Sequence, residues 1–268
     1  MKRVSLRVVT INILNDLSHW EARRSLLVQG LAAVMPDLVT LQEVSLGIDN
    51  AGWLAGQLGF DYLYISPKLG SDRHQEGIAI LSRLPFVAQD TLDLLGQGRV
   101  AQCVQIRGGD HTILFANGHL FWQPGDSETR LNQVRRLLAW LGEIRGEHPV
   151  VICGDFNGTP ETQAIQEICQ QYASAYASIH GTEPAYTCPT PRKRSFLSQL
   201  NTLRSYFMYL RPQHINPFWR GTLDYIFVDP RLQVKDCQII LNMPSLTHIN
   251  IYPSDHFGLY AELDTGVL

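Results

Sequence analysis

The sequence predicts an α+β fold in which two packed sheets are flanked by helices. Short runs of β-branched and other apolar residues recur along the whole chain, and runs of this length are typical of strands. Helical periodicity appears between some of these runs but does not alternate strictly with them. Such clustering of strands favours two packed sheets over a doubly wound parallel sheet. No repeat, low-complexity tract or linker interrupts the pattern, so we expect one domain over residues 1–268.

Eight segments of four to eight residues are predicted to be strands. They are residues 6–13, 37–44, 77–82, 101–106, 112–117, 150–153, 223–228 and 257–263. The spacing of apolar residues predicts a first helix over Trp20–Val34. A second helix is predicted over Glu128–Ile144, with Asp126 or Ser127 as its N-cap. A third helix is expected to begin after Pro160.

The composition limits the classes of function that fit the chain. With 268 residues, of which 45% are hydrophobic and 18% charged, the chain has the composition of a folded protein with a large core. The formal net charge of −3 disfavours a protein that grips long nucleic acid duplexes through many phosphates. No apolar run approaches the roughly 20 residues that span a bilayer, and no cleavage motif follows the first residues. We therefore expect a cytoplasmic protein without a transmembrane segment.

The cysteines predict structural thiols. They are scattered without a C-x-x-C pair, which disfavours both a thiolate zinc site and a disulfide framework. We expect them to be reduced. The five are Cys103, Cys153, Cys169, Cys188 and Cys237.

Polar side chains stand at the ends of several predicted strands, where a rigid scaffold can aim them into one cleft. Asn12 closes the first apolar strand, although taken alone it also fits an ordinary turn residue. Glu43 ends an apolar strand, where a buried carboxylate needs a metal ion or a basic partner. Because a hard cation such as Mg²⁺ prefers carboxylate oxygens, Glu43 is a candidate metal ligand. An exposed carboxylate at a strand edge is the alternative.

Two later segments add a histidine, a carboxylate and an amide. His119 lies beside aromatic residues, a setting that also suits a buried structural histidine. A further apolar strand runs into Gly-Asp-Phe-Asn at 154–157, and extended geometry would place Asp155 and Asn157 on the same side. Asp155 could accept a proton from an attacking water, and Asn157 could hold a phosphate oxygen. An Asx turn leading into the next helix is the alternative.

The last two segments supply what phosphate hydrolysis still requires. Asp224 opens a predicted buried strand, and the pair Asp255-His256 opens the last strand. A histidine kept protonated by a carboxylate can neutralise charge on a pentacoordinate transition state, and Asp255 could complete the shell of a metal ion. Ordinary surface turns are the alternative for each segment taken alone.

Six motifs thus follow one another along residues 6–263: Asn, Leu-Gln-Glu, Asn-x-His-Leu, Gly-Asp-Phe-Asn, Leu-Asp-Tyr and Ser-Asp-His. This order resembles the exonuclease-endonuclease-phosphatase superfamily, which has the deoxyribonuclease-I-like fold. The resemblance implies a four-layer α/β/β/α sandwich of two mainly antiparallel sheets flanked by helices. Residues 117–122, 183–187 and 221–227 look like the deadenylase, nocturnin and Angel branch, which hydrolyses RNA 3′ ends or nucleotide phosphates with Mg²⁺.

The resemblance implies a site for Mg²⁺ or Mn²⁺. Glu43 would bind the metal, while Asn12 and Asp255 would lie beside it and orient phosphate or metal-bound water. Two positions depart from the family pattern. Leu14 stands where some members carry a metal-binding Asp, which leaves the number of metal ions open. Gly118 stands where Thr or Ala is usual before the histidine, a change that we expect to affect packing alone.

The resemblance also implies a catalytic role for the remaining motif residues. Asp155 would align and deprotonate the attacking water, and Asn157 would hold a phosphate oxygen. His119 would contact the scissile phosphate. His256 would stabilise the charge that develops on the phosphate, and Asp224 would orient His256. These roles describe metal-assisted, in-line attack by water without a covalent enzyme intermediate.

A basic and aromatic insertion is predicted at about 190–220. No acidic residue occurs between Pro184 and Leu223, and aromatic residues interleave with the cations. This pairing can hold single-stranded nucleic acid by phosphate contact and base stacking, so Arg192, Arg194 and Arg220 are candidate substrate-binding residues. A solvated basic face over a packed helix is the first alternative. A membrane-surface helix over residues 195–211, or a dimer contact, is the second.

We therefore predict a Mg²⁺- or Mn²⁺-dependent hydrolase of phosphodiester bonds. A 3′ exonuclease on single-stranded RNA or short oligonucleotides is the first candidate activity, since the modest negative charge suits short substrates. A phosphomonoesterase acting on a nucleotide cofactor or a phosphoinositide is the alternative that uses the same machinery. A non-catalytic binding module of the same fold is the alternative outside enzymes. The presence of Glu43, Asp155 and His256 together argues against that module.

Overall fold

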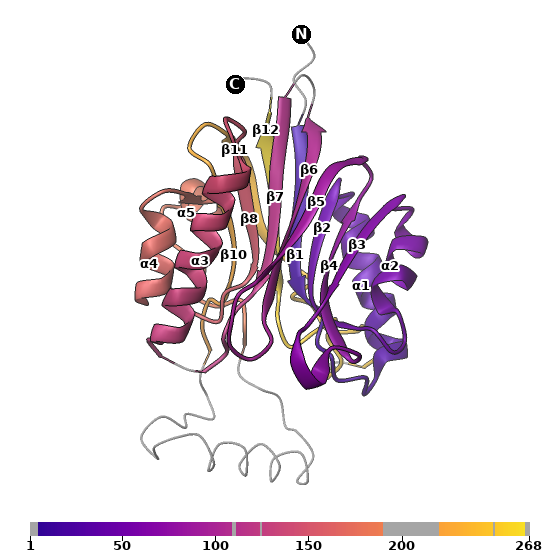
Figure 1. The fold of residues 1–268 in the computed structure, drawn as a ribbon. Coiled ribbons are helices and arrows are strands. Elements are labelled where there is room, and N and C mark those ends of the chain that lie inside the picture. Colours follow the sequence, from indigo (N-terminus) through magenta and orange to yellow (C-terminus); the bar gives the residue numbers. More distant parts are fainter. Residues whose placement is uncertain (1–4, 109–110, 124, 190–219, 249, 266–268) are drawn as a thin grey trace.

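Two six-stranded sheets pack face to face, and helices cover the outer face of each (Figure 1). The computed structural model describes residues 5–108, 111–123, 125–189, 220–248 and 250–265. The strand order is β11-β12-β1-β2-β4-β3 in the first sheet and β5-β6-β7-β8-β10-β9 in the second. Most neighbouring strands run antiparallel, but β1 pairs with β2, and β7 with β8, in parallel. The predicted four-layer α/β/β/α sandwich is confirmed.

The first sheet carries two helices on its outer face. Its strands are β1 (Ser5–Asn12), β2 (Leu38–Ser45), β3 (Tyr62–Pro67), β4 (Glu76–Ser82), β11 (Gln233–Ile240) and β12 (Gly258–Asp264), and its helices are α1 (Trp20–Val34) and α2 (Asn50–Leu58). A short 3₁₀ helix, η1 (Gly70–Asp72), lies between β3 and β4. Leu27 and Leu31 of α1 pack against the outward side chains of the sheet, among them Ile11.

The second sheet is covered in the same way by α3 and α4. Its strands are β5 (Phe86–Asp93), β6 (Val100–Gly108), β7 (His111–His119), β8 (Val150–Asp155), β9 (Ala173–Ser174) and β10 (Asp224–Val228), and its helices are α3 (Glu128–Ile144), α4 (Gln163–Cys169) and α5 (Ala175–His180). The Ser127 hydroxyl accepts a hydrogen bond from the backbone N–H of Arg130 and caps α3 as predicted. Asp126 instead accepts from the first residue of α4, Gln163, at 2.8 Å. The helix predicted after Pro160 is therefore α4, and it begins at Gln163.

A third apolar layer lies between the sheets. It is formed by the inward side chains of both, including Val8 and Ile80 from the first and Phe115 and Ile226 from the second. None of these four side chains exposes more than 1% of its surface. The two sheets therefore form a rigid base on which polar groups at the strand ends can be held.

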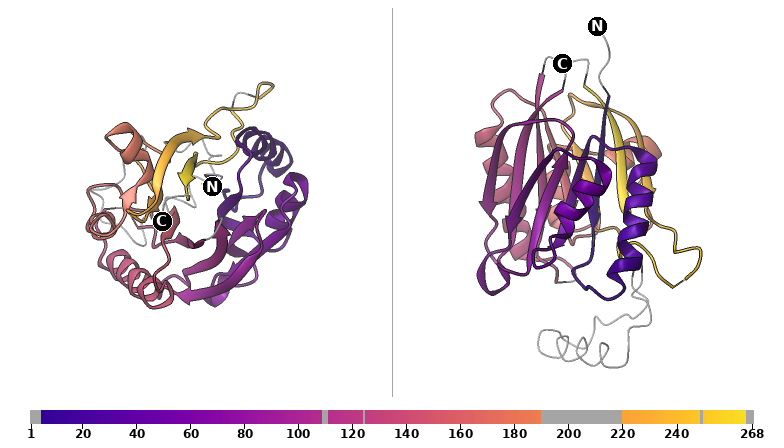
Figure 2. Two further views of the ribbon diagram at one scale, coloured as in Figure 1. Left: turned by 90° about the horizontal axis from the view of Figure 1, so that it is seen from above. Right: turned by 90° about the vertical axis from the view of Figure 1, so that its right-hand side faces the viewer.

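The two parallel strand pairs place four strand ends at the same edge of the sandwich. Each pair is joined through a helix, as β1-α1-β2 and as β7-α3-β8. All four strands run towards the lower edge in Figure 1, while β10 and β12 start from that edge. The views in Figure 2 show the same sandwich from above and from the side. No helix within the described ranges is long and apolar enough to cross a membrane.

Gly154 in β8 is a position at which the fold tolerates no side chain. Its φ is +142°, and a Cβ built there would lie 2.0 Å from the carbonyl oxygen of Gly118 in β7. We expect Gly154→Ala to lower the free energy of unfolding by more than about 2 kcal/mol, because backbone must move in two strands. Urea denaturation measures the change.

A matched control lies in α3. Gly142 has nothing within 4 Å of a built Cβ. We expect Gly142→Ala to stabilise the protein by up to about 1 kcal/mol, because alanine is the better helix former. Equal effects of the two substitutions would contradict the proposed close approach of β7 and β8.

Candidate active site

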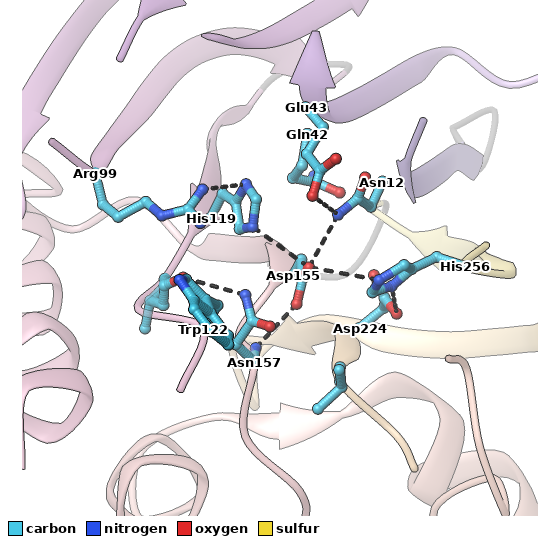
Figure 3. A network of polar contacts seen from close by, with 12 residues as sticks. Asn12, Gln42, Glu43, Arg99, His119, Trp122, Asp155, Asn157, Asp224 and His256 are labelled. Carbon is cyan, nitrogen blue, oxygen red and sulfur yellow. Dashed lines mark hydrogen bonds and ion pairs between the residues drawn. The ribbon is translucent and has the colours of Figure 1, made fainter. Parts of the chain in front are cut away.

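Polar side chains from both sheets converge where β1, β7 and β8 end, and Figure 3 shows them from close by. They lie at the end of β1, in β2, at the ends of β7 and β8, at the start of β10 and just before β12. The converging residues that the sequence predicted are Asn12, Glu43, His119, Asp155, Asn157, Asp224 and His256.

Asn12 joins the two sheets through its side-chain amide. Its Nδ2 atom donates to Oε1 of Glu43 at 3.1 Å and to Oδ2 of Asp155 at 3.1 Å. Glu43 has a φ of +56° and lies where the register between β2 and β4 shifts. A residue in the left-handed region at a bulge is costly unless its surroundings hold it, and such positions often aim functional side chains. The backbone N–H of Asn15 donates to the other carboxylate oxygen of Glu43 at 3.0 Å.

Asp155 lies at the centre of the site, where it contacts side chains from both sheets. Only 1% of its surface is exposed. Its Oδ2 atom lies 3.5 Å from Nε2 of His119 and 3.9 Å from Nε2 of His256. Burial, with a smaller contribution from the nearby Asp224 carboxylate, raises the pKa of Asp155 to about 7. A carboxylate with a pKa near neutrality is suited to accept a proton at physiological pH.

Asn157 lies beside Asp155, but not for the reason that the sequence suggested. Its φ is +52°, so the strand does not continue through it in extended geometry. The chain turns instead, and the backbone N–H of Asn157 donates to Oδ1 of Asp155 at 2.9 Å. Its side-chain Nδ2 donates to the carbonyl oxygen of Leu120 at 3.1 Å. The extended geometry expected for this segment was wrong, and the Asx turn considered as the alternative is present.

His256 and Asp224 form a buried pair. Nδ1 of His256 lies 2.9 Å from Oδ2 of Asp224. Burial alone would lower the pKa of His256, but the Asp224 carboxylate and other neighbours outweigh it and raise that pKa well above its ordinary value. His256 is therefore held as a cation next to Asp155. The hydroxyl of Thr187 donates to the same Asp224 oxygen at 2.6 Å, a role that the sequence did not assign.

His119, in contrast to His256, is held as a neutral ring. Its side chain is 3% exposed, and burial followed by the charge of Arg99 keeps its pKa well below the ordinary value. Nη1 of Arg99 lies 2.7 Å from Nδ1 of His119 and 3.1 Å from Oε1 of Glu76. Neither Arg99 nor Glu76 was predicted from the sequence. Both lie outside the six motifs, and no local pattern distinguishes them.

Two polar residues of the motifs hold the sheets together beneath the site. Nε2 of Gln42 donates to Oδ1 of Asn117 at 2.7 Å, and both side chains are fully buried. This bond links β2 with β7 directly. Gly118 lies between Asn117 and His119, and a Cβ built there would meet a single Leu120 side-chain carbon, at 3.2 Å. A Cβ at this position would therefore crowd one side chain, and the expectation that Gly118 affects packing alone stays a prediction.

Buried arginines fix the loops that leave β1 and β7. Arg23 of α1 donates to backbone carbonyls of the loop after β1 and reaches the carbonyl oxygen of Pro253 at 3.3 Å. Arg130 of α3 donates to Phe121 O at 3.0 Å and to Gly125 O at 2.7 Å. Because each guanidinium binds several carbonyls at once, the loops around the site are held in one conformation.

The predicted ligands of a divalent cation fit that ion in the chemistry of their donors. Burial, followed by the repulsion of Asp255, raises the pKa of Glu43. A hard cation bound between the two carboxylates would offset this repulsion. In the part of the chain that the structure describes, the compact group of three possible ligands is a different one. Asp155, Asp224 and His256 have ligand atoms within 4.8 Å of one another. Oδ1 of Asp224 is also buried with no hydrogen-bond partner among the described residues.

We favour the Glu43 position over the group of three. Oδ2 of Asp224 is already bound by His256 and Thr187, and His256 is cationic. A cationic ring is neither a ligand nor a good neighbour for a metal ion.

Of the predicted substrate-binding arginines, the structure describes Arg220. Arg192, Arg194 and the segment 195–211 lie outside the described residues. Arg220 is exposed, and its guanidinium lies 5.1 Å from the centre of the Tyr186 ring. Tyr186 directly precedes Thr187, the residue that contacts Asp224, so Arg220 lies on the side of the site where His256 is held.

Comparisons with known proteins cover almost the whole chain. A family model described as the Endonuclease/Exonuclease/phosphatase family matches residues 9–256. Nocturnin of Drosophila melanogaster is 27% identical over 91% of this chain and 42% of its own length. The CCR4-Not complex 3′-5′-exoribonuclease subunit Ccr4 of Debaryomyces hansenii is 24% identical over 89% of this chain and 34% of its own length. The chain therefore spans less than half the length of these relatives.

A solved structure resembles the fold described above. The human Nocturnin catalytic domain with bound sulfate anion superimposes with a TM-score of 0.74 and 25% sequence identity. The match covers 98% of this chain and 95% of that domain.

Proposed function

The chain belongs to the endonuclease/exonuclease/phosphatase family and is most like its deadenylase and nocturnin branch, and on this premise we propose that it hydrolyses phosphodiester bonds with a divalent metal ion. The single observation that supports the proposal most is the environment of Asp155. A buried carboxylate with a pKa of about 7 faces one neutral and one cationic histidine. These groups match a base that takes a proton from water and two partners for the phosphate.

The reaction we propose is in-line attack of water on phosphorus. Asp155 accepts the proton of the attacking water, and Asn157 holds a non-bridging phosphate oxygen. His119 donates a hydrogen bond to the phosphate, and the cationic His256 neutralises the charge that develops on it. Asp224 orients His256 through the 2.9 Å contact at Nδ1. No covalent enzyme intermediate is needed.

Glu43 and Asp255, with Asn12 beside them, would hold Mg²⁺ or Mn²⁺. When bound, the metal ion supplies Lewis-acid stabilisation of charge on the phosphate oxygens. Asn12 holds Glu43 of the first sheet at a fixed position relative to Asp155 of the second through its contacts with both. Arg192, Arg194 and Arg220 are retained as proposed substrate contacts.

We propose a 3′ exonuclease on single-stranded RNA or short oligonucleotides as the activity. The 3′-5′-exoribonuclease named among the relatives supports this choice. A phosphomonoesterase acting on a nucleotide cofactor or phosphoinositide is the second candidate, because one carboxylate base and two histidines serve either reaction.

A substrate panel tests the proposal. Poly(A), short RNA and DNA oligonucleotides, NADP⁺ and inositol phosphates are incubated with the wild type and with Asp155→Asn, with and without Mg²⁺. We expect Mg²⁺-dependent cleavage by the wild type that Asp155→Asn lacks. Mononucleotide release from RNA identifies an exonuclease, and release of inorganic phosphate identifies a phosphomonoesterase. If no ester is cleaved with Mg²⁺ or, in a repeat of the panel, with Mn²⁺, the non-catalytic binding module is the better description.

A further inference from the structure

Arg99 lies against the ring of His119 on the side away from Asp155 (Figure 3). It directly precedes β6, and its side chain is 8% exposed. One guanidinium nitrogen, Nη1, is 2.7 Å from Nδ1 of His119 and 3.1 Å from Oε1 of Glu76. The other ring nitrogen of His119, Nε2, is 3.5 Å from Oδ2 of Asp155. The ring is thus held between a cation and the carboxylate at the centre of the site.

The chemistry of arginine decides which ring nitrogen carries the proton. A guanidinium offers only N–H donors and stays charged in folded proteins. In a contact of 2.7 Å, Nδ1 of His119 must therefore accept a hydrogen bond, and an accepting ring nitrogen bears no proton. The proton of the neutral ring is left on Nε2, which faces Asp155.

We propose that Arg99 is a positioning residue that fixes His119 as the Nε2–H tautomer, so that this ring donates a hydrogen bond into the site. Glu76 holds the guanidinium in place through Oε1, and its other oxygen accepts from Nζ of Lys68 at 3.2 Å. The consequence for catalysis rests on the proposed function: His119 is a neutral donor to the phosphate, whereas His256 carries positive charge. The two histidines are not interchangeable.

Glu76 is the group that would favour the other tautomer of His119 if Arg99 were removed. Oε1 of Glu76 is 3.8 Å from Nδ1 of His119, close enough to become its partner if Arg99 were absent. A carboxylate beside Nδ1 favours a proton on that nitrogen, the arrangement that His256 has with Asp224. Nε of Arg99 is buried without a hydrogen-bond partner in the described part of the chain, an unfavourable state that a purely structural arginine would not need.

Nuclear magnetic resonance of ¹⁵N-labelled histidines tests the proposal without substrate. Long-range ¹H–¹⁵N correlations distinguish the two neutral tautomers, and a His119→Gln variant assigns the signals. In the wild type at neutral pH, we expect His119 to show the Nε2–H pattern. In Arg99→Met, we expect Nδ1–H to appear because Glu76 becomes the partner of Nδ1. A wild-type Nδ1–H pattern, or an unchanged pattern in Arg99→Met, overturns the proposal.

Lys68→Met is the matched control. Lys68 contacts the same carboxylate through the other oxygen, so removing its charge leaves the Arg99–His119 contact in place. We expect its His119 pattern to stay that of the wild type. Should Arg99→Met not fold, Arg99→Gln keeps a polar side chain at this position and leaves Glu76 beside Nδ1, so we expect Nδ1–H to appear there as well, because an amide oxygen or the Glu76 carboxylate can accept from Nδ1. An exclusive Nε2–H pattern in that variant would overturn the proposal.

Kinetics connect the tautomer with the reaction. We expect Arg99→Met to lower kcat by about 10²-fold with little change in KM. A loss of about this size is typical when an enzyme loses one hydrogen-bond donor to the charge that develops in the transition state. Arg99→Lys, which keeps a cationic donor, should recover part of the loss, and Arg135→Met, which removes the cation of an exposed ion pair with Glu167, should stay near the wild type. If the wild type cleaves no phosphate ester, the proposed function fails, but the resonance experiment still decides the role of Arg99.

Discussion

Asp155→Asn is expected to lower kcat for phosphate-ester hydrolysis by about 10³-fold or more without unfolding the protein, since a general base contributes about 10²–10⁴-fold. Asparagine has almost the same shape but only one acceptor oxygen, so it can keep the bond from Asn157 or the bond from Asn12, and its NH2 group faces the other donor. An amide, however, cannot take a proton from water at neutral pH. The measurement is kcat on the ester that the wild type cleaves fastest, with Asp61→Asn at an exposed position as the control.

The same substitution should also remove a pH-dependent cost from the stability of the metal-free protein. Burial raises the pKa of Asp155 from the ordinary 3.8 to about 7, so the folded state binds the proton more tightly than the unfolded state. Between these two values, stability falls as the pH rises, and above about 7 the full cost of the buried charge is present. Asparagine carries no such cost.

We therefore expect the urea midpoint of Asp155→Asn to rise relative to that of the wild type as the pH increases from about 4 to above 7, in the presence of a chelator. The change comes from the wild type, whose carboxyl loses its proton over this range. A difference in urea midpoint that stays the same at all these pH values would mean that burial does not raise the pKa of Asp155. A variant that keeps a tenth or more of the activity would remove Asp155 from the reaction.

The interior of the fold could be predicted from the sequence, but its edges could not. All eight predicted strands are present, because a strand buried on both faces reads as a continuous apolar run. The four that were missed, β3, β5, β9 and β11, are the two outer strands of each sheet. The segment Phe86–Asp93, for example, is mostly exposed, and its polar residues resemble those of a loop. An edge strand is defined by its neighbour more than by its own residues.

Some residues of the site could likewise be predicted from the sequence, whereas others could not. Residues at strand ends, such as Glu43 and Asp155, could be found because a carboxylate next to an apolar run is locally conspicuous. Arg99 directly precedes β6 and Glu76 begins β4 of the other sheet, so both reach His119 only once the two sheets are packed together. Thr187 was part of a family-like motif, but only its contact with Asp224 gives it a function.

We assign the proposed metal ion to Glu43 because of the cationic contacts that each carboxylate already has. At Asp224, one oxygen is bound by His256 and Thr187, and the cationic ring next to it opposes a second positive charge. Glu43 has hydrogen bonds from Asn12 and Asn15 but no cationic partner in contact among the described residues, and the nearby Asp255 disfavours its charged form. A divalent cation offsets that repulsion at Glu43 and adds to the repulsion at His256.

Glu43→Gln is accordingly expected to weaken Mg²⁺ and Mn²⁺ binding by more than about 100-fold, since even outer partners of a metal ligand contribute about 10–100-fold. Asp224→Asn should weaken binding by less than about 10-fold while still lowering kcat, because it releases His256. Calorimetric titration with Mg²⁺ measures both affinities, and Glu143→Gln on the exposed face of α3 is the control. In the wild type, a chelator should abolish hydrolysis and added Mg²⁺ should restore it. The reverse ranking, with strong binding kept in Glu43→Gln and lost in Asp224→Asn, would place the ion among Asp155, Asp224 and His256 instead.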